Sequence, residues 1–266
     1  MGNITFGKYI PMNSFVHKLD PRLKLITLFI LLVTIFFDVG FIGYGIMAVL
    51  ILTIVELAKL KFNYILRALK PMMFMMLFLL IFNIFMYKSG SPLISFGKFT
   101  IYTGGILQSL YIVIRLLLII SVTTVLTATT KPLDLTLGLE HILNPLRRFG
   151  FPSHEIAMMI SIALRFIPTL LEETQRIMKA QASRGVDFSE GTLKEKVLSI
   201  VSLIVPLFIS AFSRAEELAN AMESRCYNPD GKRTRYKQLK WTKNDTLSLL
   251  VVCLVSVGLI TYSLVF

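Results

Sequence analysis

Long apolar runs separated by short polar segments make up the first half of the chain, and one more apolar run ends it. The runs are residues 25–37, 39–57, 71–87, 106–130 and 247–266. A helix needs about 20 mostly apolar residues to cross the hydrocarbon core of a bilayer, which is roughly 30 Å thick. The pattern therefore predicts an all-α, polytopic membrane protein with about five transmembrane helices.

The first two runs are separated only by Asp38 and a few glycines, so they fit either one bent helix or two short crossings. Basic residues flank the pair on both sides: Lys18, Arg22 and Lys24 before it, and Lys59, Lys61, Arg67 and Lys70 after it. Because Lys and Arg gather in cytoplasmic loops, both flanks are expected in the cytoplasm. Two crossings satisfy this requirement and one does not.

The remaining runs complete a topology in the cell (cytoplasmic) membrane. The third run begins with Pro71, which is tolerated in the first turn of a helix. The loop before the fourth run has only two basic residues, Lys88 and Lys98, whereas the strongly basic segment 231–243 precedes the fifth run. We therefore predict that the N-terminus is cytoplasmic and the C-terminus external.

The segment between the fourth and fifth runs differs from the rest of the chain. We expect membrane helices 1 to 4 in residues 1–130, a cytoplasmic coupling domain in residues 131–244 and the last membrane helix in residues 245–266. The middle segment holds seventeen of the 28 basic residues. Its two apolar stretches, 156–171 and 197–212, are judged too short to cross a bilayer comfortably.

Each apolar stretch of the coupling domain continues into a polar, helix-forming segment. We therefore expect two long helices that lie along the membrane face, apolar at their start and charged at their end. Arg165 and Pro168 interrupt the first stretch, and Pro206 interrupts the second. Because proline removes a backbone hydrogen bond and kinks a helix, Pro168 and Pro206 are expected to let the helices follow the membrane.

The ends of these two predicted helices nearly repeat each other, as "KAQASRGVD" (179–187) and "NAMESRCYN" (220–228). In both, small residues precede a single arginine. Gly185 is expected to adopt the left-handed conformation that ends many helices. Cys226 takes that place in the second copy, and a Cβ atom disfavours the conformation. We therefore expect the second helix to end differently, with a turn made by Asn228, Pro229 and Gly231.

Composition and charge exclude several classes of function. The chain is 55% hydrophobic with a net charge of +12. Because the charges are grouped in particular segments, they indicate the orientation of the chain in the membrane, and we expect no nucleic-acid partner. The two cysteines, Cys226 and Cys253, cannot build a disulfide framework or a cysteine-based zinc site. The sequence contains no G-x-x-x-x-G-K-[ST] phosphate loop and no metal-ligand spacing. We expect no catalytic residue, metal or cofactor in this chain.

Arg115 stands out because it lies well inside the fourth apolar run. An arginine inside a membrane span is a functional candidate by default. The structural alternative, with equal weight, is that it pairs with a polar group in the helix bundle and fixes the packing.

Three blocks of sequence resemble the transmembrane T component (EcfT) of energy-coupling factor, or ECF, vitamin transporters. The blocks are "SFVHKLDPRLKL" (14–25), the segment 129–188 with "RFIPTLLEETQRIMKAQASRG" inside it, and "SRAEELANAMESRCY" (213–227). The resemblance implies a scaffold in the lipid bilayer that links two ABC-type ATPase subunits (EcfA and EcfA') to a substrate-binding S component. The ATPase subunits would bind ATP and Mg, and the S component would bind a vitamin or another micronutrient.

The resemblance also implies roles for individual residues. The two ATPase-docking motifs would be Ala182, Ser183, Arg184 and Gly185, and Glu223, Ser224, Arg225 and Cys226. The family usually has glycine where this chain has Cys226. The kinks near Arg165, Pro168 and Pro206 are expected to contact the S component.

Two other classes of membrane protein are alternatives to a coupling subunit. A self-contained secondary transporter is the main alternative, but the chain lacks an obvious inverted repeat and paired carboxylates within its membrane spans. An intramembrane enzyme is the other, but no constellation of a nucleophile and a base, or of metal ligands, is present in the sequence.

Overall fold

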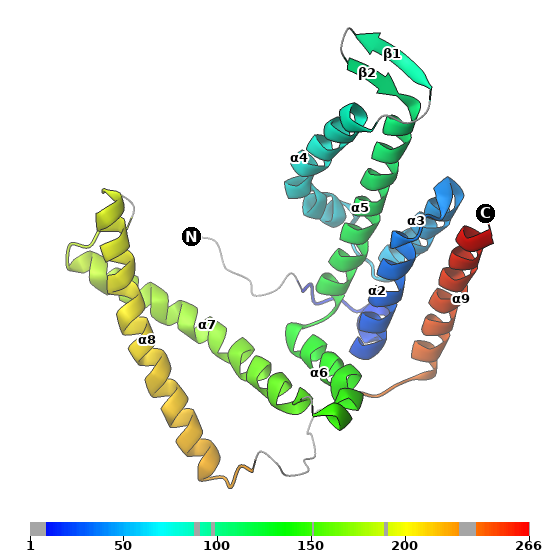
Figure 1. Cartoon of the computed structure of the whole chain (residues 1–266). Helices are drawn as coiled ribbons and strands as arrows, with labels where there is room; N and C mark the ends of the chain where they lie inside the picture. The colour runs from blue at the N-terminus through cyan, green and yellow to red at the C-terminus, as the bar shows by residue number, and fades with distance from the viewer. Residues whose placement is uncertain are drawn as a thin grey trace. The chain divides into compact units, whose positions relative to one another are not determined.

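The computed structural model describes residues 9–87, 91–96, 99–150, 152–188, 191–228 and 238–265. The chain divides into two compact units (Figure 1). The first unit combines Met1–Ile142 with Leu239–Phe266, and the second is Leu143–Gln238. In the sequence, the second unit is therefore an insertion into the first.

Helices dominate the first unit. Its elements are α1 (Phe15–Lys18), α2 (Pro21–Phe36), α3 (Gly40–Leu57), α4 (Phe62–Met86), β1 (Pro92–Phe96), β2 (Phe99–Tyr102), α5 (Thr103–Thr129), α6 (Pro132–Leu143) and α9 (Lys243–Val265). Within the described ranges, strands occur only in the antiparallel β1–β2 hairpin, where Phe96 pairs with Phe99. The predicted all-α membrane fold is confirmed, with this hairpin as a small addition.

Among the described residues, six helices are long and apolar enough to cross a membrane: α3, α4, α5 and α9, and also α7 and α8 of the second unit. Large apolar side chains on the helices of the first unit point outward. Phe29 is 69% exposed, Phe74 82% and Leu264 73%. A surface of this kind is unfavourable in water and is expected where lipid is the solvent. The chain is therefore a multi-pass membrane protein.

The first two apolar runs form separate helices. The chain breaks after α2, and α3 begins at Gly40, which has a φ of +64°. Helix α2 has 16 residues, about 24 Å at 1.5 Å per residue, so its crossing of the membrane stays a prediction. Helix α4 starts at Phe62 and continues through Pro71. The expectation that this helix begins at Pro71 is therefore wrong, because an interior proline is tolerated in membrane helices.

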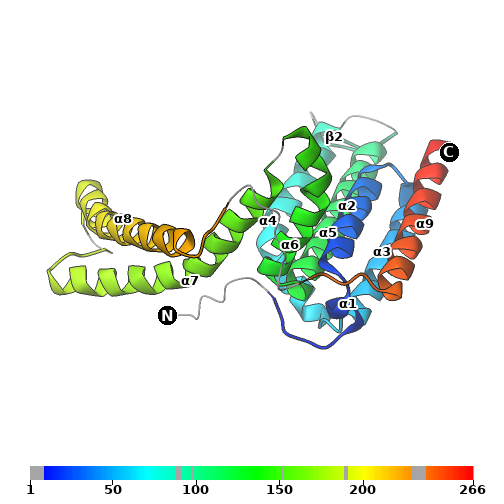
Figure 2. The ribbon, with the colours of Figure 1, turned by 90° about the horizontal axis from the view of Figure 1, so that it is seen from below.

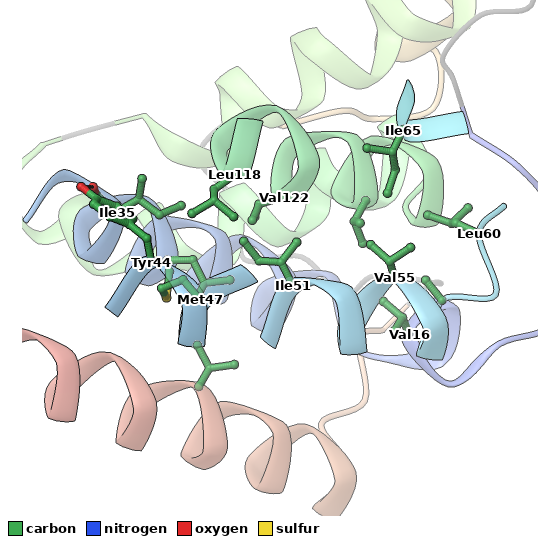
Figure 3. Close-up of a cluster of buried hydrophobic side chains, with 14 of the residues drawn as sticks. Val16, Ile35, Tyr44, Met47, Ile51, Val55, Leu60, Ile65, Leu118 and Val122 are labelled. Atoms are coloured by element: carbon green, nitrogen blue, oxygen red, sulfur yellow. Dashed lines mark hydrogen bonds between the residues drawn. The ribbon is translucent and has the colours of Figure 1, made fainter. Parts of the chain in front are cut away.

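The core of the first unit lies between α2, α3 and α5, and α9 packs against α2. Figure 3 shows Met47 and Ile51 of α3 beside Leu118 and Val122 of α5. Helix α9 adds Val252 to the same cluster. The side chains of this cluster are mostly aliphatic, and the helices around it also bury polar side chains such as Thr34, Ser121 and Ser256.

One buried carboxylate joins the starts of the first and last long helices of this unit. Asp245, only 1% exposed, accepts a hydrogen bond from the Asp20 N–H at 2.9 Å. Its second oxygen accepts from the Thr242 N–H at 2.7 Å and from the Thr242 hydroxyl at 2.6 Å. The Asp20 carboxylate in turn caps α2 by accepting from the Arg22 N–H at 2.8 Å. Negative charge is favourable at a helix N-terminus, and the Asp245 carboxylate lies at the N-termini of both α2 and α9.

Helix α6 packs closely on the start of α2 through Gly138. A Cβ atom on Gly138 would lie 3.2 Å from Leu25 Cδ1 and 3.3 Å from both the Arg22 nitrogen and the Pro21 carbonyl carbon. Only glycine allows this approach without a shift. The first unit therefore extends to Ile142, near the end of α6. The coupling domain expected from residue 131 stays a prediction.

The second unit contains a short 3-10 helix, η1 (Asn144–Phe149), and two long helices, α7 (Ser153–Ser183) and α8 (Leu193–Glu223). Figure 2 shows α7 and α8 running beside each other, joined by the short segment between them. They are antiparallel, because Gln181 near the end of α7 contacts Ser202 near the start of α8. Arg214 Nη2 lies 3.4 Å from Glu173 Oε2, which links the helices again farther along.

The helices α7 and α8 confirm the two long helices expected from the sequence. Each has 31 residues, about 46 Å at 1.5 Å per residue. Both are amphipathic, whereas α3 and α9 are apolar on every side. The statement that their apolar stretches are too short to cross a bilayer is wrong, because each helix contains a sufficiently apolar window of 18 residues. Their placement along the membrane face stays a prediction.

Candidate functional site: the ends of α7 and α8

Helix α7 ends in a Schellman motif. The Gly185 N–H donates to the Ala182 carbonyl at 3.0 Å, and the Val186 N–H donates to the Gln181 carbonyl at 3.1 Å. Gly185 has a φ of +86°, as expected from the sequence. These two bonds satisfy carbonyls that a helix end otherwise leaves without partners. They hold Arg184 on a defined turn.

Helix α8 ends in the same way, 41 residues later. The Cys226 N–H donates to the Glu223 carbonyl at 2.9 Å, and the Tyr227 N–H donates to the Met222 carbonyl at 3.0 Å. Cys226 itself adopts the left-handed conformation, with a φ of +56°. Our expectation of a different ending is therefore wrong, because the backbone bonds outweigh the cost of a Cβ atom in this conformation. Asn228 follows the two backbone bonds that close the turn, and Pro229 and Gly231 lie outside the described residues.

The two ends present matching, open surfaces. All eight motif residues, Ala182 to Gly185 and Glu223 to Cys226, are exposed. The Ser183 hydroxyl donates to the Lys179 carbonyl at 3.1 Å, and the Ser224 hydroxyl donates to the Asn220 carbonyl. Both serines thus turn back onto their own helix and leave the helix tip narrow. In the part of the chain that the structure describes, Arg184 and Arg225 have no hydrogen-bond or ion-pair partner.

Comparison with known proteins identifies the family. A family model described as cobalt transport protein, CbiQ, matches residues 12–236. A protein of Bacillus subtilis named energy-coupling factor transporter transmembrane protein EcfT is 45% identical over 262 residues, which cover 98% of each chain. Proteins with the same name from Macrococcus caseolyticus and Staphylococcus aureus are 44% and 46% identical, over 95% and 94% of this chain and 95% and 93% of their own. The chain belongs to the EcfT family.

In this EcfT-family chain, the carbonyl that Pro206 leaves without a partner in its own helix bonds to the neighbouring helix, which the sequence did not reveal. A proline at position 206 has no N–H to give to the carbonyl of Ser202, four residues earlier. That carbonyl accepts instead from Gln181 Nε2 of α7 at 3.3 Å. Pro206 therefore opens a hydrogen-bonding position through which α7 and α8 are linked. Gln181 sits one residue before the docking motif of α7, so this link lies directly behind the exposed end.

The other kink residues of the EcfT-family chain lie on α7. Arg165 and Pro168 are both exposed, and α7 remains helical through Pro168. Among the described residues Arg165 has no ion-pair partner. Their proposed contact with an S component stays a prediction.

Arg115 lies on α5, in the first unit, and is bonded to a tyrosine. Its Nη2 donates to the Tyr44 hydroxyl at 2.7 Å, and its Nε lies 3.2 Å from the same oxygen. The Tyr44 hydroxyl is 3.3 Å from the carbonyls of Ile35 and Phe37 at the end of α2. The guanidinium also lies 5.9 Å from the centre of the Phe36 ring. This arrangement supports the packing interpretation of Arg115, because it fixes the end of α2 against α3 and α5.

No group of three His, Cys, Asp or Glu side chains in the described ranges could hold a metal ion. His17 is structural: its Nε2 lies 3.0 Å from the Ile10 carbonyl and must donate, while Nδ1 lies 2.6 Å from the Ser14 hydroxyl. Burial lowers the pKa of His17, which keeps the ring neutral near pH 7.

Proposed function

We propose that this chain is the coupling subunit of an ECF transporter. The ends of α7 and α8 dock on two ABC-type ATPase subunits, and ATP hydrolysis by those subunits moves the helices. The helices pass the movement to a substrate-binding S component in the membrane. The chain itself performs no chemical step and binds no ATP or Mg.

The observation that carries this proposal is the pair of equivalent, exposed, arginine-bearing helix ends. One backbone geometry occurs twice, on the two longest helices of the chain, and each time it presents an arginine without a partner among the described residues. A helix C-terminus alone gives an exposed arginine only about 0.3 to 1 kcal/mol through the helix dipole. That effect explains neither the repetition nor the narrow tips.

The small residues at each tip indicate how docking would occur. Ala180, Ala182 and Ser183 on α7, and Ala219, Ala221 and Ser224 on α8, are all exposed. Their lack of bulk lets the tip enter a groove in the ATPase subunit. There the planar guanidinium can make several charge-assisted hydrogen bonds to carboxylate or carbonyl oxygens.

Substitution of the arginines tests the proposal. Arg184→Ala or Arg225→Ala should each weaken ATPase docking by about 2–5 kcal/mol, because a buried charge partner is left unpaired. Arg→Lys should rescue poorly, since Lys lacks the planar fork. The measurement is co-purification of the ATPase subunits with the solubilised chain, together with ATP-driven uptake in whole cells.

Two controls keep this experiment interpretable. Glu172→Ala removes an exposed charge in the middle of α7, 12 residues before Arg184, and should leave docking unchanged. Membrane insertion of every variant is checked in parallel. A double mutant, Arg184→Ala with Arg225→Ala, that inserts normally and still retains both ATPase subunits would contradict the docking proposal.

The outward faces of α7 and α8 support the contact with an S component. Exposed apolar side chains follow both helices, including Met159 on α7 and Phe208 and Ile209 on α8. An amphipathic helix of this kind suits the membrane interface and a membrane-embedded partner. In this proposal the S component, and not this chain, determines which vitamin or micronutrient is transported. The N-terminus and the α7–α8 unit are cytoplasmic and the C-terminus is external, following the charge distribution.

A further inference from the structure

The ends of α7 and α8 have the same backbone but opposite charge. Residues 175–187 contain three basic side chains and one acidic one, a net charge of +2: Arg176, Lys179 and Arg184 against Asp187. The equivalent residues, 216–228, contain one basic side chain and three acidic ones, a net charge of −2: Arg225 against Glu216, Glu217 and Glu223. Every one of these side chains is exposed.

The difference in charge is concentrated at three equivalent positions. Arg176 corresponds to Glu217, Lys179 to Asn220 and Ala182 to Glu223, each 41 residues apart. Arg176 forms an ion pair with Glu173 of the same helix, with 3.6 Å between Nη1 and Oε2. One turn farther from the tips, Glu173 also pairs with Arg214 across the hairpin at 3.4 Å. That pair largely neutralises itself, so it does not distinguish the two ends.

Charges farther back contribute little at the arginine. Glu172 lies 12 residues before Arg184, about 18 Å along the helix. The Debye length at physiological salt is about 8 Å. Within its own helix, the charge near each arginine is therefore that of the last three turns.

Resting on the proposed function, we infer that these charges decide which ATPase subunit binds which end. The backbone cannot discriminate, because the Schellman bonds of the two tips agree within 0.1 Å (3.0 and 3.1 Å in α7, 2.9 and 3.0 Å in α8). The α7 end takes the subunit whose groove has the more acidic rim, and the α8 end takes the subunit with the more basic rim. The arginines supply docking strength at both ends, while the surrounding charges supply the assignment, since like charges brought together suppress the wrong pairing.

The chain contains a natural probe for this assignment. Cys226 is exposed at the tip of α8, and Gly185→Cys with Cys226→Ser places an equivalent thiol at the tip of α7. Cysteine is tolerated at a positive φ at position 226, so it is a matched choice at position 185. Cys253, the other cysteine, is replaced by Ala in all variants. Benzophenone maleimide attached to either thiol then captures the neighbouring ATPase subunit in the assembled complex on illumination.

The test exchanges the charges and leaves the arginines in place. The exchanged chain carries R176E, K179N and A182E on α7, and E217R, N220K and E223A on α8, which reverses the two net charges. In the parent chain each tip should capture one ATPase subunit in preference to the other. In the exchanged chain the ratio of the two captured subunits should reverse, by at least about tenfold at each tip. Added salt should weaken the preference in both chains.

Each other outcome counts against one identifiable statement. An unchanged assignment in the exchanged chain, or random capture in the parent chain, would overturn the inference about charge. Loss of both subunits from a normally inserted exchanged chain would also overturn it, because the exchanged residues would then contribute to docking itself and not to the choice of subunit. Absence of both ATPase subunits from the parent tips would contradict the proposed function itself.

Discussion

At the end of α8, a cysteine holds a backbone conformation that is usually left to glycine. Cys226 has a φ of +56°, and Gly185 at the equivalent position of α7 has +86°. A residue with a Cβ atom loses roughly 1 kcal/mol or more in this region. The two Schellman bonds that pass through the turn compensate for this cost. The end of α8 is therefore formed at lower stability than the end of α7.

Cys226→Gly should tighten the end of α8. We expect a gain of about 0.5–1 kcal/mol after the greater chain entropy of glycine in the unfolded state is subtracted. Hydrogen exchange at the Tyr227 amide should slow about two- to fivefold. Gly185→Ala is the matched opposite change and should speed exchange at the Val186 amide. Faster exchange at Tyr227 in Cys226→Gly would show that the thiol stabilises the turn in some other way.

The same residue shows a limit of sequence reasoning. The repeated arginine and the small residues before it were sufficient to locate both helix ends, and propensity correctly placed Gly185, while docking at these ends stays a prediction. Propensity failed at Cys226, because a preference of about 1 kcal/mol cannot decide against two backbone hydrogen bonds that form only in the folded turn. Arg115 is a similar case: its burial in an apolar run was evident, but its partner Tyr44 is 71 residues away.

At the scale of elements, Pro206 affects the contact between α7 and α8 as well as the course of α8. Pro206→Ala adds an N–H that can donate to the Ser202 carbonyl, which now accepts from Gln181. We expect the hairpin to lose about 0.5–1.5 kcal/mol of coupling between its helices. ATPase subunits should still co-purify, whereas ATP-driven uptake should fall. The coupling is measured by a double-mutant cycle with Gln181→Met on the unfolding of the solubilised chain.

Pro168→Ala is the matched control for this experiment. It replaces the other proline of the hairpin, and no interhelical hydrogen bond between described residues uses the Leu164 carbonyl, four residues before Pro168. If transport depends on the curvature of the helices, both proline variants should impair uptake equally. If it depends on the Gln181 bond, Pro206→Ala should impair uptake more. Additive effects of Pro206→Ala and Gln181→Met would contradict the proposed link.

Helix boundaries were predictable in proportion to the length of the apolar pattern. The periodic runs of α3, α5 and α9 located those helices closely. The start of α4 was misplaced by nine residues, because Pro71 looked like a first-turn proline and the polar turn before it also forms helix. The apolar lengths of α7 and α8 were underestimated, because only residues 156–171 and 197–212, which lie between flanking polar or charged residues, were counted. The Gln181–Ser202 contact depends on how two helices pack, which no local pattern records.

For the molecule as a whole, Asp245 is the polar contact that joins the start of α2 to the start of α9. Asp245→Asn keeps the shape but removes the charge that three donors share. We expect a loss of roughly 1.5–3 kcal/mol, typical of hydrogen bonds to a charged group. The unfolding midpoint in a titration of mixed micelles with denaturing detergent measures it. Asp38→Asn, at an exposed carboxylate, is the control and should change the midpoint little.

A midpoint for Asp245→Asn equal to that of the control would mean that the neutral amide replaces the carboxylate without loss. The sequence pattern located the last membrane helix but not its contact with Asp20. The two aspartates are 225 residues apart, and a contact at that distance leaves no periodic signal in a single chain.

That distance also sets an order of events during synthesis. The Asp20 N–H receives its partner only when the ribosome has made residue 245, by which time the whole of Leu143–Gln238 has been translated. The α7–α8 unit thus exists as a finished polypeptide before the first unit can close around its last helix. A nascent chain that ends before α9 would already contain the ends of α7 and α8, while its first unit would lack its last helix. Any cellular quality control that tests whether α9 has packed against α2 can therefore act only after the ends of α7 and α8 have been translated.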